Sequence, residues 1–489
     1  IAFINYLLAT TSLRDKFKTV RLQIPKTVAI SVEEFDKFID ENRLQKVVIM
    51  NDDRAIGEAF VNSNLSSTLQ ESLLDFVENC NLPLAVRSSS LLEDSQFLPF
   101  AGIYSTYMLP NNHPDVQVRL GHLMRAIKLV YASVFSKCSK SYISSTPYKI
   151  SEEKMGIVIQ QIVGQRYGDE FYPAFSGVAK SYNYYPFSHM KQEEGVAQIA
   201  LGLGRLVIEG GNALRFSPVY PEIIPQFSSI SDIFKSSQKY FYALNLNSDA
   251  GNMFLDDSAN LDSLKIDQAE KDILNVISSV YDIQDQAVKE DIFCKGPKII
   301  TFANILKYNI FPLAQILVEL LNLLKTSMGK EIEIEFAVNL FKDKKVKASI
   351  DLLQVRPLVV NKEGIEITEE DRKRENMICR CKKTLGNGMS NVHDVVFVEP
   401  DKFDSAKTRQ ISAEVEKINS ILHEQNRPYL LIGMGRWGTA DPWLGIPVNW
   451  DQISNVEAIV ETSIGNFFFE PSQGSHFFQN ITARGVGYF

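Results

Sequence analysis

The sequence predicts an α+β or α/β protein with two domains, the second smaller than the first. Runs of β-branched and other apolar residues alternate with segments whose apolar residues recur at helical spacing. A chain of 489 residues is longer than a single hydrophobic core usually supports. A charge-dense segment, residues 361–383, separates a long unit, 1–360, from a shorter unit, 384–489. We therefore expect two domains joined by this charged linker.

Composition limits the classes of partner. The formal net charge of −8 leaves no basic excess to neutralise the phosphates of a nucleic acid. No apolar run approaches the roughly 18 residues of a membrane span. The best candidate for a membrane span, 305–324, is interrupted by Lys307 and Glu319. Five cysteines, including Cys379 and Cys381, predict neither a disulfide framework nor a zinc site, so we expect a reducing, cytoplasmic setting.

The first part of the chain predicts helices around a broken strand. Pro25 interrupts a strand-like run that continues to residue 30, because proline removes a backbone donor. Ser31 with Glu34 three residues later is a capping-box pattern, which predicts a helix start. Apolar residues at helical spacing predict helices over 64–80 and 116–134, and residues 1–8 predict another. The sequence starts at Ile1 without signal-peptide features, so we expect a fragment or a chain lacking its leader.

The stretch from residue 82 to residue 107 predicts a phosphate site. An apolar run, 82–86, predicts a strand that ends at Arg87. Ser88–Ser90 follow in an expected turn, and the loop closes with Gly102. A fixed guanidinium, hydroxyl donors and the backbone N–H groups of a small-residue turn can bind one polyanion together. The alternative interpretation is a buried strand followed by a solvated, serine-rich turn.

Two further stretches combine strands with glycines. Residues 155–163 and 176–179 predict a pair of β-strands, with Gln160 as a polar residue on the first. Gly202 and Gly204 follow another strand-like run, which suits a tight turn or a close approach of the backbone to a phosphate. A single G-x-G is weak evidence. A plain buried strand pair remains the alternative for the first stretch.

An acidic strand and its return strand form a predicted hairpin. Acidic and apolar residues alternate along 331–340, so Glu333 and Glu335 share one face. Gln354 and Arg356, again two apart, share a face of the return strand. Neighbouring carboxylates repel by roughly 1 kcal/mol at surface dielectric. A Mg²⁺ ion bridging bound phosphates would relieve this repulsion, and a solvated edge strand balanced by lysines is the alternative.

These motifs resemble, in order, those of one known family. V-R-S-S-S-L-L-E-D-S with a downstream F-A-G, then G-L-G, then E-I-E-F with L-Q-V-R-P, begin at residues 86, 100, 202, 333 and 353. They are similar to motifs of the nucleotide-binding domain of the pyruvate phosphate dikinase and phosphoenolpyruvate synthase family. The resemblance implies an ATP-grasp-like domain that binds ATP and Mg²⁺. It also implies a lysine-bearing Gly-Gly-Lys loop, which we expect immediately before Ile1.

The resemblance assigns roles to single residues. Glu333 and Glu335 are implied as metal ligands, and Arg87 and Arg356 as catalytic groups that neutralise phosphate charge. Arg205 stands where the family has a glutamate, which reverses a charge beside the expected nucleotide. The residues implied in nucleotide binding are Arg87, Ser88, Ser89, Gly102, Gln160, Gly202, Gly204, Gln354 and Arg356.

The C-terminal unit resembles the family's small swivelling domain less closely. That domain carries a phosphorylated histidine, and S-H-F-F, beginning at residue 475, lies near the expected position. His476 is therefore the predicted catalytic phosphoryl carrier. Phe477 replaces a small residue of the family motif, and an ordinary half-buried histidine is the alternative. The segment 433–450 holds all three tryptophans, and we interpret it as an anion-binding loop or, preferably, a docking loop.

The predicted function is that of an ATP-dependent phosphotransferase of the phosphoenolpyruvate synthase type. The resemblance implies that ATP, pyruvate and water become phosphoenolpyruvate, AMP and phosphate through a phosphohistidine. The expected partners are ATP and a small-molecule phosphoryl acceptor, with pyruvate implied only by resemblance; neither nucleic acid nor membrane is expected, and a homodimer is left open. The alternative is a nucleotide-binding regulatory or scaffold module that transfers no phosphoryl group.

Overall fold

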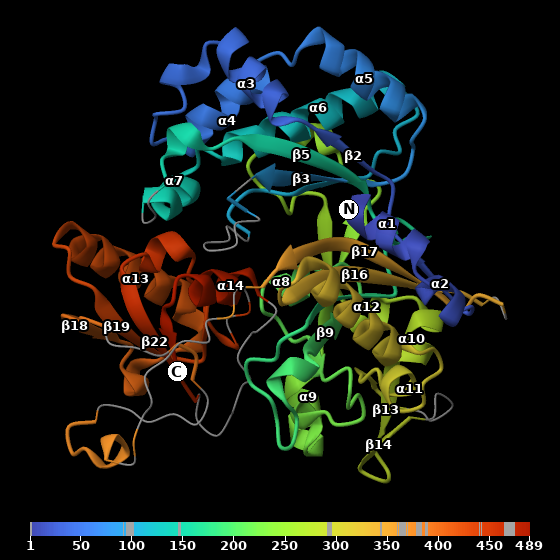
Figure 1. The fold of residues 1–489 in the computed structure, drawn as a ribbon, viewed down its shortest axis with the longest axis vertical. Coiled ribbons are helices and arrows are strands. Elements are labelled where there is room, and N and C mark those ends of the chain that lie inside the picture. Colours follow the sequence, from blue (N-terminus) through green and yellow to red (C-terminus); the bar gives the residue numbers. More distant parts are fainter. Residues whose placement is uncertain are drawn as a thin grey trace.

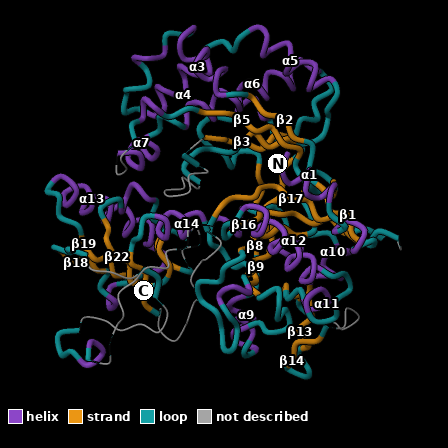
Figure 2. Tube along the Cα trace, in the orientation of Figure 1, coloured by secondary structure: helices purple, strands orange, loops and turns teal. Residues whose placement is uncertain are grey.

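The computed structural model contains three packed units (Figure 1). Two of them, drawn above and below the chain's N-terminus, precede residue 361, and the third is the C-terminal unit. Figure 2 shows that each unit mixes helices with strands. The structure describes residues 2–489 except 91, 94–101, 145–147, 291–295, 343–344, 359, 361–367, 369, 378–383, 387–389, 440, 442 and 464–474. Cys379, Cys381 and much of the predicted linker therefore lie outside the described residues.

The upper lobe is a four-stranded sheet covered by helices on one face (Figure 1). Asp52, Ser66 and Asp115 accept hydrogen bonds from the backbone at the starts of three of these helices, which fixes where each begins. Their apolar stripes pack on the sheet in one core. The strands, in sheet order, are β2 (Thr27–Ile30), β5 (Met155–Gln161), β3 (Leu84–Ser90) and β4 (Tyr107–Leu109), and the helices are α3 (Val32–Glu41), α4 (Asp53–Asn62), α5 (Ser67–Glu78), α6 (Val116–Ser133) and α7 (Lys137–Ser144).

The lower lobe is built on a six-stranded sheet. Its central hairpin presents Ile332, Ile334 and Phe336 to the same core as the apolar stripe of helix α12 (Leu313–Met328), which ends at Gly329 in the left-handed conformation. The strands, in sheet order, are β1 (Val20–Gln23), β17 (Ala348–Pro357), β16 (Ile332–Leu340), β8 (Phe175–Lys180), β9 (Val196–Ala200) and β10 (Leu214–Phe216).

Smaller sheets and helices complete the lower lobe. One further sheet pairs strands that are far apart in sequence, and the other is a three-stranded antiparallel sheet whose first strand in sequence lies in the middle. The remaining elements are β6 (Gln165–Tyr167), β7 (Glu170–Tyr172), β11 (Tyr240–Asn245), β12 (Leu261–Lys265), β13 (Ser278–Asp282), β14 (Ala287–Lys289), β15 (Lys298–Ile300), α1 (Ala2–Thr10), α2 (Leu13–Lys16), α8 (Arg205–Ile208), α9 (Ile230–Ser236), α10 (Lys271–Ile277) and α11 (Ala303–Leu306).

The C-terminal unit has a parallel sheet of four strands, ordered β18-β19-β22-β23. Every sheet of the described chain takes its strands from one side of residues 361–383, which supports the proposed domain division at that segment. The elements are β18 (Asp394–Phe397), β19 (Tyr429–Met434), β20 (Arg436–Trp437), β21 (Gly445–Ile446), β22 (Val456–Thr462), β23 (Gly487–Tyr488), α13 (Thr408–Glu424) and α14 (His476–Ala483).

Most of the predicted elements are confirmed, and two local details are wrong. Ser31 precedes helix α3, but its side chain caps no backbone N–H, because the N–H of Glu34 donates to the Ser31 carbonyl; the Glu34 carboxylate accepts from Lys37 and Ser66 instead of the Ser31 backbone. The three serines predicted in a turn after Arg87 belong to strand β3, where they pair with β5. None of the described helices is long and apolar enough to cross a membrane.

We predict that Leu317→Ala destabilises the lower lobe. Leu317 is fully buried on helix α12, so the truncation removes apolar contacts and leaves a cavity. The free energy of unfolding should fall by about 2–5 kcal/mol in chemical denaturation. The same substitution at Leu82, which is 40% exposed, is the control and should change stability by about 0.5 kcal/mol or less. Equal effects at both positions would contradict the proposed packing.

Candidate active site

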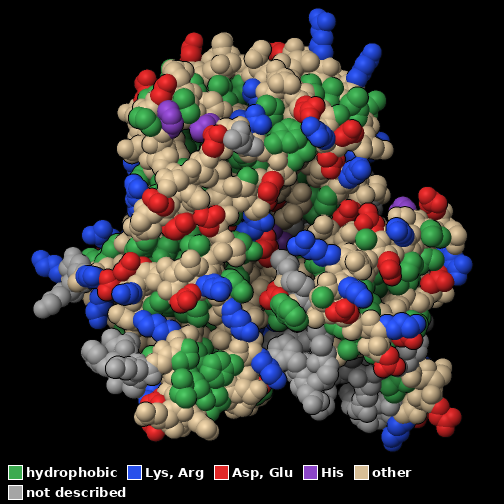
Figure 3. All heavy atoms as spheres, turned by 180° about the vertical axis from the view of Figure 1, so that it is seen from behind, with side chains coloured by type: hydrophobic (Ala, Val, Ile, Leu, Met, Phe, Trp, Pro, Cys, Tyr) green, Lys and Arg blue, Asp and Glu red, His purple; other side chains and the backbone are tan. Residues whose placement is uncertain are grey.

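A cavity of about 400 Å³ lies where all three units meet. Its lining includes Arg87 and Gly102 from the upper lobe, Glu335 and Arg356 from the lower lobe, and His476 from the C-terminal unit. Seen from behind, the molecule is hollowed between its upper and lower parts (Figure 3). On that face the described basic and acidic side chains are interspersed (Figure 3). The fold thus brings together, at one cavity, catalytic candidates separated by most of the chain.

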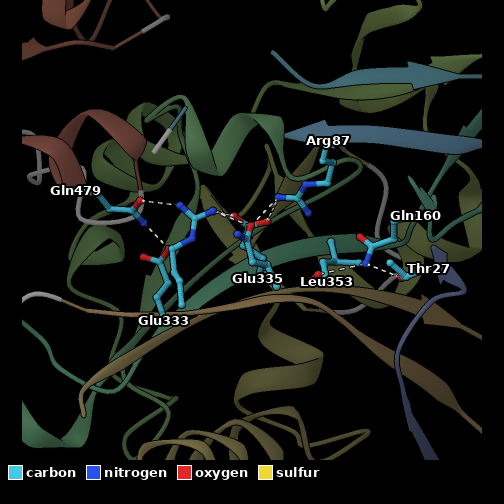
Figure 4. Close-up of polar contacts among 9 residues, drawn as sticks. Thr27, Arg87, Gln160, Glu333, Glu335, Leu353 and Gln479 are labelled. Atoms are coloured by element: carbon cyan, nitrogen blue, oxygen red, sulfur yellow. Dashed lines mark hydrogen bonds and ion pairs between the residues drawn. The ribbon is translucent and has the colours of Figure 1, made fainter. Parts of the chain in front are cut away.

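Two arginines from opposite lobes converge on one carboxylate (Figure 4). Arg87 Nη2 donates to Glu335 Oε2 at 3.0 Å and to Gln354 Oε1 at 2.8 Å. Arg356 Nη2 donates to Glu335 Oε1 at 3.3 Å and to the same Gln354 oxygen at 2.7 Å. Each guanidinium therefore has its charge partly balanced, and both are held at the edge of the cavity.

The strand register explains why these side chains meet. Strands β16 and β17 are antiparallel, and Glu335 lies directly opposite Gln354. Glu333 lies opposite Arg356, and the register shifts immediately after Glu335. Arg87 reaches the hairpin from β3 across the lobes, 248 positions earlier in the chain than Glu335. The two predicted pairs, Glu333 with Glu335 and Gln354 with Arg356, thus lie on one face of the hairpin.

The arginines determine the charge of Glu335. Burial acts to raise its pKa, but the guanidinium groups of Arg87 and Arg356 hold the pKa down at about 2. Glu335 is consequently ionised at neutral pH. Its carboxylate occupies the position between two guanidinium groups that an incoming phosphate could also occupy.

Gln160 and the serines lie beside an adjoining cavity. Gln160 is buried and donates to Thr27 Oγ1 at 3.2 Å and to the carbonyl of Leu353 at 3.3 Å (Figure 4). It lines the central cavity and also a second cavity of about 630 Å³. Ser88 and Ser89 line only the second of these two cavities. The structure therefore separates these serines from the cavity that contains His476.

The two glycines of the G-x-G motif have different surroundings. Gly204 lines the central cavity. Gly202 does not; it has a φ of +83°, and an added Cβ would lie 2.7 Å from the carbonyl oxygen of Tyr242. Its need for glycine is thus explained by packing against strand β11. Arg205 lines the cavity and is ion-paired with Glu209 at 2.6 Å and Asp257 at 3.3 Å.

Glu333 lies beside Glu335 on the strand but does not line either cavity. Its Oε2 is 3.0 Å from Lys180 Nζ, and both side chains are only 2% exposed. Its Oε1 accepts a hydrogen bond from Gln479. Among the described residues no group of three or more His, Cys, Asp and Glu side chains could hold a metal ion. Of the two carboxylates predicted as metal ligands, Glu335 lines the cavity and Glu333 does not.

His476 is the first residue of helix α14 and faces the upper lobe. Its ring lies against Gly102, since a Cβ on that glycine would come within 2.3 Å of His476 Nδ1. His476 Nε2 is buried and makes no hydrogen bond to the described residues. Burial, together with the positive charge of Arg356, lowers the pKa of His476 to about 3. The imidazole is therefore neutral and nucleophilic at pH 7.

The tryptophan-rich segment, 433–450, docks on the lower lobe at the backbone of Gly210. Arg436 Nη1 donates to the carbonyl of Gly210 at 2.9 Å, and Thr439 Oγ1 donates to the same oxygen at 3.4 Å. Trp450 packs against Tyr142 of helix α7, with ring centroids 5.9 Å apart. This geometry favours the docking interpretation of the segment over the anion-binding one.

Sequence reasoning missed two residues of this region. Neither Lys180 nor Gln479 is predicted from the sequence as part of a site. Both are polar residues next to apolar ones, in F-S-G-V-A-K and H-F-F-Q, so neither has a local signal of function. Their partners, Glu333 and Arg356, are more than a hundred residues away and appear only in the fold.

Comparison with known proteins identifies relatives of this chain. The model of the family described as "Pyruvate phosphate dikinase, AMP/ATP-binding domain" matches residues 10–377. The chain is also similar to "Uncharacterized phosphotransferase YvkC" of Bacillus subtilis (strain 168), with 29% identity over 189 residues. That alignment spans 39% of this chain and 20% of the Bacillus protein.

We predict that His476 does not titrate between pH 8 and pH 5. Its lowered pKa keeps the imidazole neutral throughout this range, whereas a histidine in an unfolded chain titrates near 6.5. The test is an NMR pH titration of the histidine ring Cε1–H signals, with His476→Ala identifying the signal. The same signal in the urea-unfolded chain is the control. A midpoint near 6.5 in the folded protein would contradict the described burial.

Proposed function

Because the chain belongs to the family of the pyruvate phosphate dikinase AMP/ATP-binding domain, we propose that it transfers a phosphoryl group from ATP to His476 and then to a small acceptor. The family supports ATP-dependent phosphotransfer in general. The observation that carries the proposal is the convergence of Arg87, Arg356 and His476 on one cavity. A neutral imidazole beside two guanidinium groups combines a nucleophile with charge stabilisation for a phosphoryl group.

Each residue has a proposed task in this reaction. Arg87 and Arg356 bind the phosphates and neutralise the charge that develops during transfer. The imidazole of His476 attacks phosphorus and forms a phosphoramidate, while the bond to the leaving phosphate oxygen breaks. Glu335 holds both arginines in place before ATP arrives. A bound Mg²⁺ would supply positive charge against the phosphates, and Glu335, one of the carboxylates that line the cavity, would help to hold it.

The overall reaction proposed is that of phosphoenolpyruvate synthase, in which ATP, pyruvate and water give phosphoenolpyruvate, AMP and phosphate. Pyruvate is proposed from the family resemblance alone. We place this activity in the cytoplasm. A second candidate function, a nucleotide-binding module without transfer, is favoured by Phe477, a large residue next to His476 that lines the cavity and whose ring lies against Gly438.

We predict that ATP labelled in its β-phosphate transfers acid-labile label to the protein. His476→Ala should abolish the label, because it removes the nucleophile. Arg87→Ala should lower the labelling rate by roughly 10²–10³-fold, as loss of a preorganised transition-state donor does. The exposed residues His423 and Arg54 provide matched alanine controls, which should label at the unmodified rate.

Two outcomes would contradict this proposal. Label retained in His476→Ala would place the carrier elsewhere. Tight ATP binding without any label in the unmodified protein would instead support the nucleotide-binding module. ATP binding should be measured by calorimetry in the same buffer, so that a loss of phosphoryl transfer can be distinguished from a loss of ATP binding.

A further inference from the structure

Helix α14 presents two polar side chains to the nucleotide domain, one turn apart. His476 and Gln479 are separated by three residues and so share a face of the helix. His476 borders the cavity, and Gln479 points to the hairpin that carries Glu333 and Arg356 (Figure 4). The two residues therefore contact the same hairpin region from one rigid element.

The side-chain amide of Gln479 hydrogen-bonds one acceptor and one donor at the same time. Its Nε2 donates to Glu333 Oε1, and its Oε1 accepts from Arg356 Nη1 at 3.5 Å. A carboxylate only accepts hydrogen bonds and a guanidinium only donates them, whereas an amide does both. A glutamate, leucine or alanine at position 479 could not satisfy both partners. Because Gln479 is only 6% exposed, water does not easily replace these bonds.

The surroundings of this amide are buried and well packed. Glu333 is ion-paired with Lys180, whose ammonium lies 5.7 Å from the ring centroid of Phe478. Phe478 packs edge-on against Tyr184, with ring centroids 5.6 Å apart. Phe478, which precedes Gln479, thus docks α14 through aromatic contacts. The amide is the polar contact that ties this docking to an arginine of the active site.

These contacts give Glu333 a different task from Glu335. Both oxygens of Glu333 are engaged, one by Lys180 and the other by Gln479. Its side chain lines neither cavity. We propose that Gln479 is a positioning residue, which seats the His476 helix on the nucleotide domain by bridging Glu333 and Arg356. In this proposal, the Glu333 carboxylate serves to hold α14 on the hairpin. This inference rests on the phosphotransfer proposed above for the same cavity.

An exchange of the two side chains tests this inference. Gln479→Glu places its carboxylate against that of Glu333, and neither group can donate a hydrogen bond. Helix α14 should therefore dock less firmly on the hairpin. In the double variant Glu333→Gln/Gln479→Glu, the new amide at 333 accepts from Lys180 and donates to the new carboxylate at 479. That carboxylate accepts from Arg356, so all donors and acceptors are again matched. Gln425→Glu, which adds the same charge at the exposed end of α13, is the control.

Two readouts are measured on the full chain. The first is hydrogen exchange of the amides of α14, which reports docking without any activity. It should be faster in Gln479→Glu and return toward the original rate in the double variant. The second is β-labelled ATP kinetics, in which Gln479→Glu should lower the maximal labelling rate about 100-fold, because a misplaced nucleophile reacts slowly. The KM for ATP should change less than about twofold, and the double variant should recover most of the rate.

The outcomes separate this inference from the proposed function. Unchanged exchange in Gln479→Glu, or no recovery in the double variant, would overturn the positioning role. A raised KM with an unchanged maximal rate would also overturn it and would make Gln479 part of nucleotide binding. If the unmodified protein takes up no label while exchange behaves as expected, the phosphotransfer proposal fails and the docking role of Gln479 stands.

Discussion

The Glu335 carboxylate between Arg87 and Arg356 is the interaction on which the rest of the site depends. It connects strand β3 of the upper lobe to the β16–β17 hairpin of the lower lobe. Without this anion, two guanidinium groups with a common partner in Gln354 would repel each other in a partly buried site. A nucleotide phosphate can take over this balancing role, so the site is preorganised for a polyanion before one binds.

The C-terminal unit completes the site rather than merely covering it. Phe478, Tyr184 and Tyr185 pack in one core with residues of both neighbouring units. Such an apolar contact restricts relative motion more than a polar, hydrated one does. The helix that carries His476 is therefore held by its neighbours Phe478 and Gln479. In the proposed reaction, the reactivity of His476 would depend on this docking as much as on the imidazole itself.

The sequence could predict what depends on local pattern. The strict alternation around Glu333 and Glu335 correctly predicted a strand face, and the apolar stripe of 116–134 correctly predicted helix α6. It could not predict that Ser88 continues strand β3, because serine has no strong preference and pairing with β5 determined the outcome. The capping box at Ser31 does not form for a similar reason, since the Glu34 carboxylate bonds Lys37 and Ser66, the residue that caps helix α5.

The same limit explains the different tasks of Glu333 and Glu335. Two residues apart and on one face, they carry the same charge and were assigned the same metal-binding role. Their neighbours across the sheet differ: Lys180 lies opposite Glu333, whereas Val178 lies opposite Glu335. The buried Lys180 forms an ion pair with Glu333 and holds that carboxylate at the interface. Strand β8 has no cation opposite Glu335, so the Glu335 carboxylate pairs with Arg87 and Arg356 at the cavity. Strand pairing, which joins β8 to β16 over some 150 residues, thus decides which acid faces the cavity and which contacts helix α14.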